Sequence, residues 1–226
     1  MRRCLTALLL LMVSTAVSAW SPRFHEVQTA LAAGLVPKDM GRMLRAHGDE
    51  LLAGARGAGS DQVPTVEEVE EQFQRILRMS TERRRTRQIV RELGVLARLV
   101  QLLGDPSATA GMTPLRERFE AYGNEHLSRL VVTREPYWAI DAPYDARPRL
   151  LDLYRQKYER HHDLTPHFDP EKGQPIGPWD FLSVPFAQLQ LSFSGGVNAT
   201  ANFWLLAWRA AGQNWEVPPP PADEIP

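Results

Sequence analysis

The residues with the clearest capacity for chemistry lie near the start of the chain. Cleavage after Ala19 would free the α-amino group of Trp20, and His25 follows on what should be the first turn of a helix. An α-amino group has a pKa of about 7.7–8, so it can lose its proton near neutrality and bind a metal together with its own carbonyl oxygen. A histidine brought back by the helical turn can complete part of such a site. The alternative is a tryptophan that packs as a hydrophobic plug, with a histidine on the helix surface.

Residues 1–19 have the layout of a signal peptide. Arg2 and Arg3 precede a short apolar segment, and small residues occupy positions 17–19. The apolar segment is shorter than the roughly 20 residues that span a bilayer, so a membrane anchor is the less favoured interpretation and no transmembrane segment is expected. We therefore expect cleavage near Ala19 and export to the periplasm or the extracellular space.

The composition of residues 20–226 sets limits on what holds the protein together and on its partners. Cys4 leaves with the leader, so no disulfide can form and a packed apolar core must stabilise the fold. Loss of Arg2 and Arg3 leaves 24 of the 26 basic residues against 27 acidic ones, a net charge of −3. This charge argues against binding of duplex nucleic acid, but it leaves a small phosphate-bearing substrate open.

Apolar residues recur at helical spacing along most of the chain and predict an all-α fold. Helices should begin at Pro22, Pro37, the capping box Thr65–Glu68 and Thr113. Further helices are expected near 89–103 and 150–161, and in an apolar run over 186–211 that is interrupted at 194–196. Residues 131–148 should be an irregular connection, and no strand pair is convincing. We expect a leader (1–19), one multi-helix domain (20–212) and a Pro-rich tail (213–226).

Several stretches are similar to one known family. WSPRFH (20–25) resembles the mature start of the zinc-dependent phospholipase C and single-strand-specific nuclease superfamily. Looser similarity covers LRAHGDELLAGARGAGSD (44–61), LGVLARLVQLLGD (93–105), LRERFEAY (115–122) and VNATANFWLLAWRAAG (197–212). The resemblance implies an all-α fold around a cluster of three zinc ions.

The same resemblance implies a set of metal ligands. Trp20, His25 and Asp105 would jointly hold one zinc ion, with Asp105 bridging to a second. Asp61 would help to hold that second ion, and Glu120 would be an auxiliary ligand. The implied activity is phosphoester hydrolysis, with a phosphate ester or a phospholipid as substrate.

The departures from the family pattern concern the histidines. Gln101 and Arg116 stand where the family has histidine, and no histidine lies between His47 and His126. An amide is a poor zinc ligand beside imidazole, and an arginine places a fixed positive charge where a dication should sit. We therefore expect at most one tightly held zinc ion per chain, or none.

Two functions from different classes follow. The first is an exported phosphoester hydrolase, in which a metal-bound hydroxide attacks phosphorus. The second is a metal-poor relative that keeps the helical fold and serves as a non-catalytic binding or structural module. The missing histidines favour the second, whereas Trp20, His25, Asp61 and Asp105 keep the first open.

Two further patterns admit more than one interpretation. LLGDP (102–106) is compatible with a metal-ligating Asp105 and equally with an ordinary helix stop, in which Gly104 ends the helix and Pro106 prevents its continuation. RHHDLTPHFD (160–169) gathers histidines and aspartates that could bind a metal. Its spacing matches no closed site, so a solvated loop is favoured there.

Overall fold

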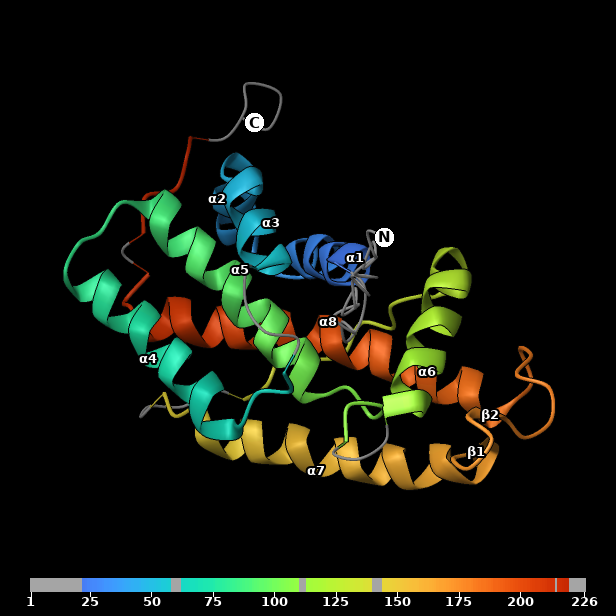
Figure 1. Ribbon diagram of the computed structural model, residues 1–226. Helices are drawn as coiled ribbons and strands as arrows, with labels where there is room; N and C mark the ends of the chain where they lie inside the picture. The colour runs from blue at the N-terminus through green and yellow to red at the C-terminus, as the bar shows by residue number, and fades with distance from the viewer. Residues whose placement is uncertain (1–21, 58–61, 110–112, 140–143, 214, 220–226) are drawn as a thin grey trace, which may run out of the picture.

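The all-α prediction is confirmed by the computed structural model, which describes residues 22–57, 62–109, 113–139, 144–213 and 215–219 (Figure 1). The helices are α1 (Pro22–Ala33), α2 (Lys38–Ala46), α3 (Gly48–Arg56), α4 (Val66–Thr81), α5 (Thr86–Leu103), α6 (Thr113–His126), α7 (Arg147–Leu164) and α8 (Val184–Ala210), with single 3-10 turns η1 (Leu127–Arg129) and η2 (Thr165–His167). A minimal antiparallel pair, β1 (Phe168–Asp169) with β2 (Gln174–Pro175), corrects the expectation that no strands pair.

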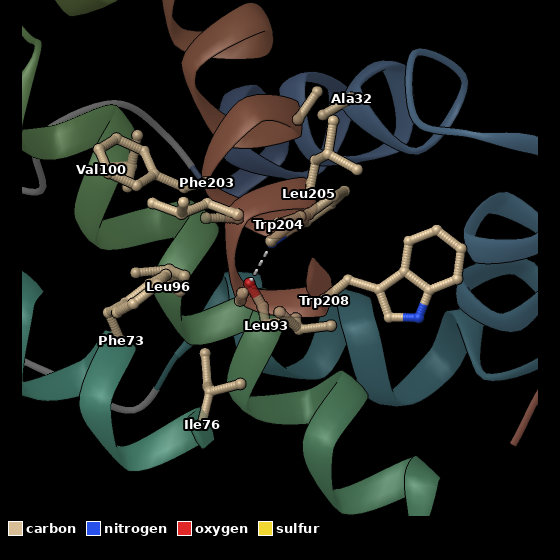
Figure 2. Packing of buried hydrophobic residues seen from close by; sticks show 14 of the residues in the cluster. Ala32, Phe73, Ile76, Leu93, Leu96, Val100, Phe203, Trp204, Leu205 and Trp208 are labelled. Carbon is tan, nitrogen blue, oxygen red and sulfur yellow. Dashed lines mark hydrogen bonds between the residues drawn. The ribbon is translucent and has the colours of Figure 1, made fainter. Parts of the chain in front are cut away.

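The long helix α8 runs through the middle of the molecule, with α1, α5 and α7 packed around it (Figure 1). Trp204 and Trp208 lie four residues apart on α8, and both are buried. Figure 2 shows Trp204 among side chains from α4, α5 and α8, with its indole nitrogen donating to the Leu93 carbonyl oxygen at 2.8 Å. This bond joins α8 to the middle of α5, the helix that carries Gln101.

Two glycines let α3 and α5 cross at backbone distance. A Cβ on Gly54 would overlap the carbonyl oxygen of Arg91, and one on Gly94 would overlap that of Leu51. At each glycine, the backbone of the other helix fills the space that a Cβ would need. The crossing fixes the position of α5 relative to the amino-terminal helices.

The expected interruption of the last helix at 194–196 is wrong, because α8 is continuous from Val184 to Ala210. The glycines there make room for neighbours and do not break the helix. Gly196 accommodates the side-chain amide of Gln28, and Gly195 faces the guanidinium of Arg160. Packing thus overrides the low helix propensity of glycine.

Of the irregular connection expected over 131–148, residues 131–139 are extended and lie along α8, whereas residues 147–148 already belong to α7. Its backbone N–H groups donate to polar side chains at helical spacing: Thr133 to Ser194 at 3.1 Å, Glu135 to Asn198 at 3.1 Å and Trp138 to Asn202 at 2.9 Å. The polar side chains on one face of α8 therefore accept the backbone hydrogen bonds that a neighbouring strand would accept from an extended segment.

The capping box that the sequence predicts is confirmed. Thr65 and Glu68 form the expected capping box at the start of α4. In contrast, α7 is longer than the predicted 150–161 and extends to Leu164. Within the described residues, no helix is both long and apolar enough to cross a membrane.

Candidate functional site

His25 lies on α1 with its ring 1% exposed, so it is not the surface histidine of the alternative interpretation. Its Nδ1 is 2.7 Å from Oε1 of Gln101, whose amide nitrogen donates to the hydroxyls of Thr29 and Thr200. Since an amide oxygen only accepts, the neutral imidazole carries its proton on Nδ1. Gln101 thus orients His25 instead of occupying a ligand position of its own.

Asp105 follows the end of α5 in a tight turn and is 1% exposed. Its Oδ1 accepts from the backbone N–H of Ser107 at 2.9 Å and from the Ser107 hydroxyl at 2.7 Å. Its Oδ2 is buried and has no hydrogen-bond partner in the described part of the chain. The turn is fixed from α7, where His161 Nδ1 donates to the Pro106 carbonyl oxygen at 2.8 Å.

The helix-stop interpretation of LLGDP is confirmed, because α5 ends at Leu103. Gly104 is the C-cap, with an ordinary φ of −87° and not a left-handed one. The absence of a side chain on Gly104 lets Leu153 of α7 pack closely against it, since a Cβ there would lie 3.0 Å from Cδ1 of Leu153. The stop and the burial of the Asp105 carboxylate therefore occur together.

Two cations act on the Asp105 carboxylate. Burial raises the pKa of Asp105 above its ordinary 3.8, while the Ser107 hydrogen bonds and the charges of Lys157 and Arg116 act in the opposite direction. Burial lowers the pKa of Lys157 below 10.5, against the attraction of Asp105, and the charge of Arg116 lowers it further. For both groups burial is the largest effect, so the fold disfavours both charges.

Lys157 is only 2% exposed and lines a cavity of about 610 Å³ between α7, the start of α4, residues 108–109 and the first turn of α6. Its ammonium lies 5.8 Å and 5.9 Å from the ring centroids of Tyr154 and Tyr158. Arg116 and Thr109 line the same cavity, and the Thr109 hydroxyl is buried with no hydrogen-bond partner among the described residues. The result is a partly enclosed cavity that is lined by two basic residues, by the acidic Glu67 and by hydroxyl donors.

The described donors do not fit a multinuclear zinc cluster. The Asp105 carboxylate is already acted on by two cations, and a dication beside it would be repelled by Lys157 and Arg116. Glu120 is half-buried on α6, and no three His, Cys, Asp or Glu side chains of the described residues come together as an ion would require. Trp20 and Asp61 lie outside the described residues.

The histidine-rich segment 160–169 is not the solvated loop that was favoured. His161, His162 and Asp163 belong to the last turns of α7, and Asp163 accepts from the Gln188 side chain at 3.0 Å. Asp169 accepts from backbone N–H groups in the β1–β2 turn and pairs with Lys172 at 3.1 Å. These contacts are structural.

Sequence reasoning missed Lys157. The available signal was its spacing: Leu150, Leu153, Lys157 and Leu164 are the buried residues of α7, so a lysine occupies a position on the apolar face. Arg116 was noticed only as a replaced ligand and not as a residue with a role of its own. A comparison of the chain with protein-family models, with curated proteins and with solved structures finds no significant match in any of the three.

Proposed function

We propose that this chain is a metal-poor, non-catalytic binding module, and that the cavity beside Lys157 and Arg116 binds a small anion such as a phosphate ester. The observation that carries the proposal is a lysine with 2% exposure on the wall of a cavity of about 610 Å³. Small-molecule sites usually measure about 300–1,000 Å³. The volume, the two cations and the hydroxyls suit a compact oxyanion.

Charge balance supports an anionic ligand. Among the described residues that line the cavity, Lys157 and Arg116 are cationic, and the one acidic residue, Glu67, already pairs with Arg147 at 2.9 Å. A bound anion would offset the cost of keeping the buried Lys157 charged out of water. Buried ionisable groups whose charges the fold disfavours are common at functional sites.

Calorimetric titration with inorganic phosphate and with glycerol phosphate tests the proposal. Lys157→Met should weaken binding about tenfold or more, the loss expected for a charge-assisted hydrogen bond. Lys172→Met, which removes an exposed lysine paired with Asp169, is the matched control and should bind as the wild type does. Arg116→Gln supplies a second variant from another helix. Equal affinity in the wild type and both cavity variants would refute the proposal.

The second candidate is the exported zinc hydrolase, at low metal occupancy. It is supported by the orientation of His25, whose Nδ1 donates to Gln101 as the second nitrogen of metal-ligating histidines usually does. It requires Trp20 and Asp61 to complete the ligand set. Zinc-dependent cleavage of a phosphodiester that is lost in His25→Ala but retained in Lys157→Met would favour this function over the binding module.

We also propose export, on the layout of residues 1–19. Expression of the full chain, followed by amino-terminal sequencing of the exported fraction, should give Trp20 as the first residue. Retention of an uncleaved chain inside the cell would contradict this.

A further inference from the structure

The loop that joins β2 to α8 presents large apolar side chains to solvent. Leu182 is 98% exposed, Ile176 54% and Phe181 44%, and Val184 opens α8 beside them. We call residues 176–184 the apolar tip. Figure 1 shows it with β1, β2 and the start of α8 at one end of the molecule, where it projects past the helices.

The backbone of the apolar tip is held in a defined turn. Asp180 Oδ1 accepts from the Leu182 N–H at 3.0 Å, and the Asp180 carbonyl oxygen accepts from the hydroxyls of Ser183 and Tyr122. Trp179 anchors the other side by donating from its indole nitrogen to the His167 carbonyl oxygen at 3.1 Å. The exposure of Leu182 is therefore built into the fold.

Cations surround the aromatic residues of the tip. The Arg129 guanidinium lies 4.3 Å from the ring centroid of Phe181, and that of Arg118 lies 5.7 Å from that of Trp179. In the described part of the chain neither guanidinium forms an ion pair with a carboxylate. Asp169 is paired with Lys172, and Asp180 is engaged in the turn, while Glu125 is close enough to act on the pKa of Tyr122.

We propose that the apolar tip docks onto an anionic phospholipid bilayer, independently of the cavity at Lys157. Leu182 and Phe181 would enter the boundary of the acyl chains, while Arg118 and Arg129 would bind lipid phosphates. Amphipathic side chains with this division, apolar stems or rings below and cationic heads above, are typical of membrane interfaces.

A membrane suits this surface better than a protein partner does. A stable protein interface covers about 800 Å² on each side. A few apolar side chains on a projecting turn, bordered by arginines, can instead insert into a fluid surface that closes around them. The arginines then match the negative headgroups.

Vesicle flotation of the mature protein tests the proposal, with phosphatidylcholine vesicles made with and without phosphatidylglycerol. Binding should require the anionic lipid and should decline toward about 1 M salt, where the Debye length is about 3 Å. Leu182→Glu should lower the bound fraction about tenfold or more, because it replaces a membrane-inserted Leu with a charge. Leu31→Glu, at an exposed apolar residue of α1, is the control of equal charge and should bind normally.

Arg129→Gln separates the electrostatic part of the contact. It should weaken binding to anionic vesicles, whereas Arg155→Gln, an exposed arginine of α7, should not. Equal binding of Leu182→Glu and Leu31→Glu, or no preference for anionic lipid, would overturn the proposal. So would a dimer in sedimentation velocity that Leu182→Glu dissociates without any vesicle binding, because the tip would then bind a second copy of the chain.

Discussion

Lys157 and Asp105 show what a single buried ionisable residue contributes to this protein. For both, burial shifts the pKa toward the neutral form, and their mutual attraction only partly offsets that shift. A buried pair of this kind is weak support for stability and is often replaced by apolar groups without loss. Lys157 also lines the cavity of the proposed binding site.

The double variant Asp105→Asn/Lys157→Met should therefore be more stable than the wild type near neutral pH, by on the order of 1–4 kcal/mol. The sign follows from the raised folded-state pKa of Asp105. Its favourable contribution is complete below the unfolded pKa, about 3.9, and is lost as the pH rises through the folded pKa. Urea unfolding at several pH values should show the gap widening between about pH 4 and pH 7. A variant less stable than the wild type at neutrality would show that the pair stabilises the fold.

The side-chain amide of Gln101 forms hydrogen bonds with three buried residues, His25, Thr29 and Thr200. Gln101→Ala should lower the free energy of unfolding by about 1–3 kcal/mol, since it leaves buried polar groups without this partner. Gln88→Ala, an exposed glutamine of the same helix, is the control for helix propensity and should change stability little. Chemical denaturation of both variants provides the measurement.

At the scale of elements, the decisive contact is the crossing of α3 and α5. Gly54 and Gly94 meet there, and neither helix tolerates a Cβ at that point without moving the other backbone. The position of α5 sets that of Gln101 and, through the turn after Leu103, that of Asp105. The crossing thus supports the site from a distance.

Gly94→Ala should destabilise the protein by about 2 kcal/mol or more, because overpacking against a backbone cannot be relieved by a rotamer change. Gly48→Ala lies in α3, where an added Cβ meets nothing within 4 Å, so it should be neutral or slightly stabilising through helix propensity. Thermal unfolding of the two variants side by side measures the difference. Similar melting temperatures would mean that the two helices separate without cost.

At the scale of the whole molecule, the number of bound zinc ions distinguishes the two proposed functions. We predict at most one tightly held zinc ion per mature chain, since Lys157 and Arg116 oppose further dications near Asp105. Elemental analysis after dialysis measures this directly. Two or three ions per chain would restore the multinuclear hydrolase.

If one zinc ion binds, it should depend on a free amino-terminal amine at Trp20. Protein beginning at Trp20 should bind zinc more tightly than protein with a few extra residues before it, because the extension converts the amine into a peptide nitrogen. Affinity of the native form should fall from about pH 8 to about pH 6, as the amine and His25 gain protons. Equal affinity of the two forms would make Trp20 a packing residue.

The sequence by itself determined the helical class and the Thr65 capping box, because these depend on short-range periodicity and on local hydrogen bonds. Only the tertiary structure decided that α8 continues through Gly195 and Gly196, where contacts from Arg160 and Gln28 outweigh local propensity.

The site divides in the same way. His25 stands out in the sequence through its spacing from Trp20, and Asp105 through the family resemblance. The sequence alone does not show that Gln101 bonds His25, since the two residues are far apart along the chain. The charges of Lys157 and Arg116 near Asp105 come from two other helices. Long-range contacts of this kind depend on how helices cross, so the charge of the site emerges only from the folded chain.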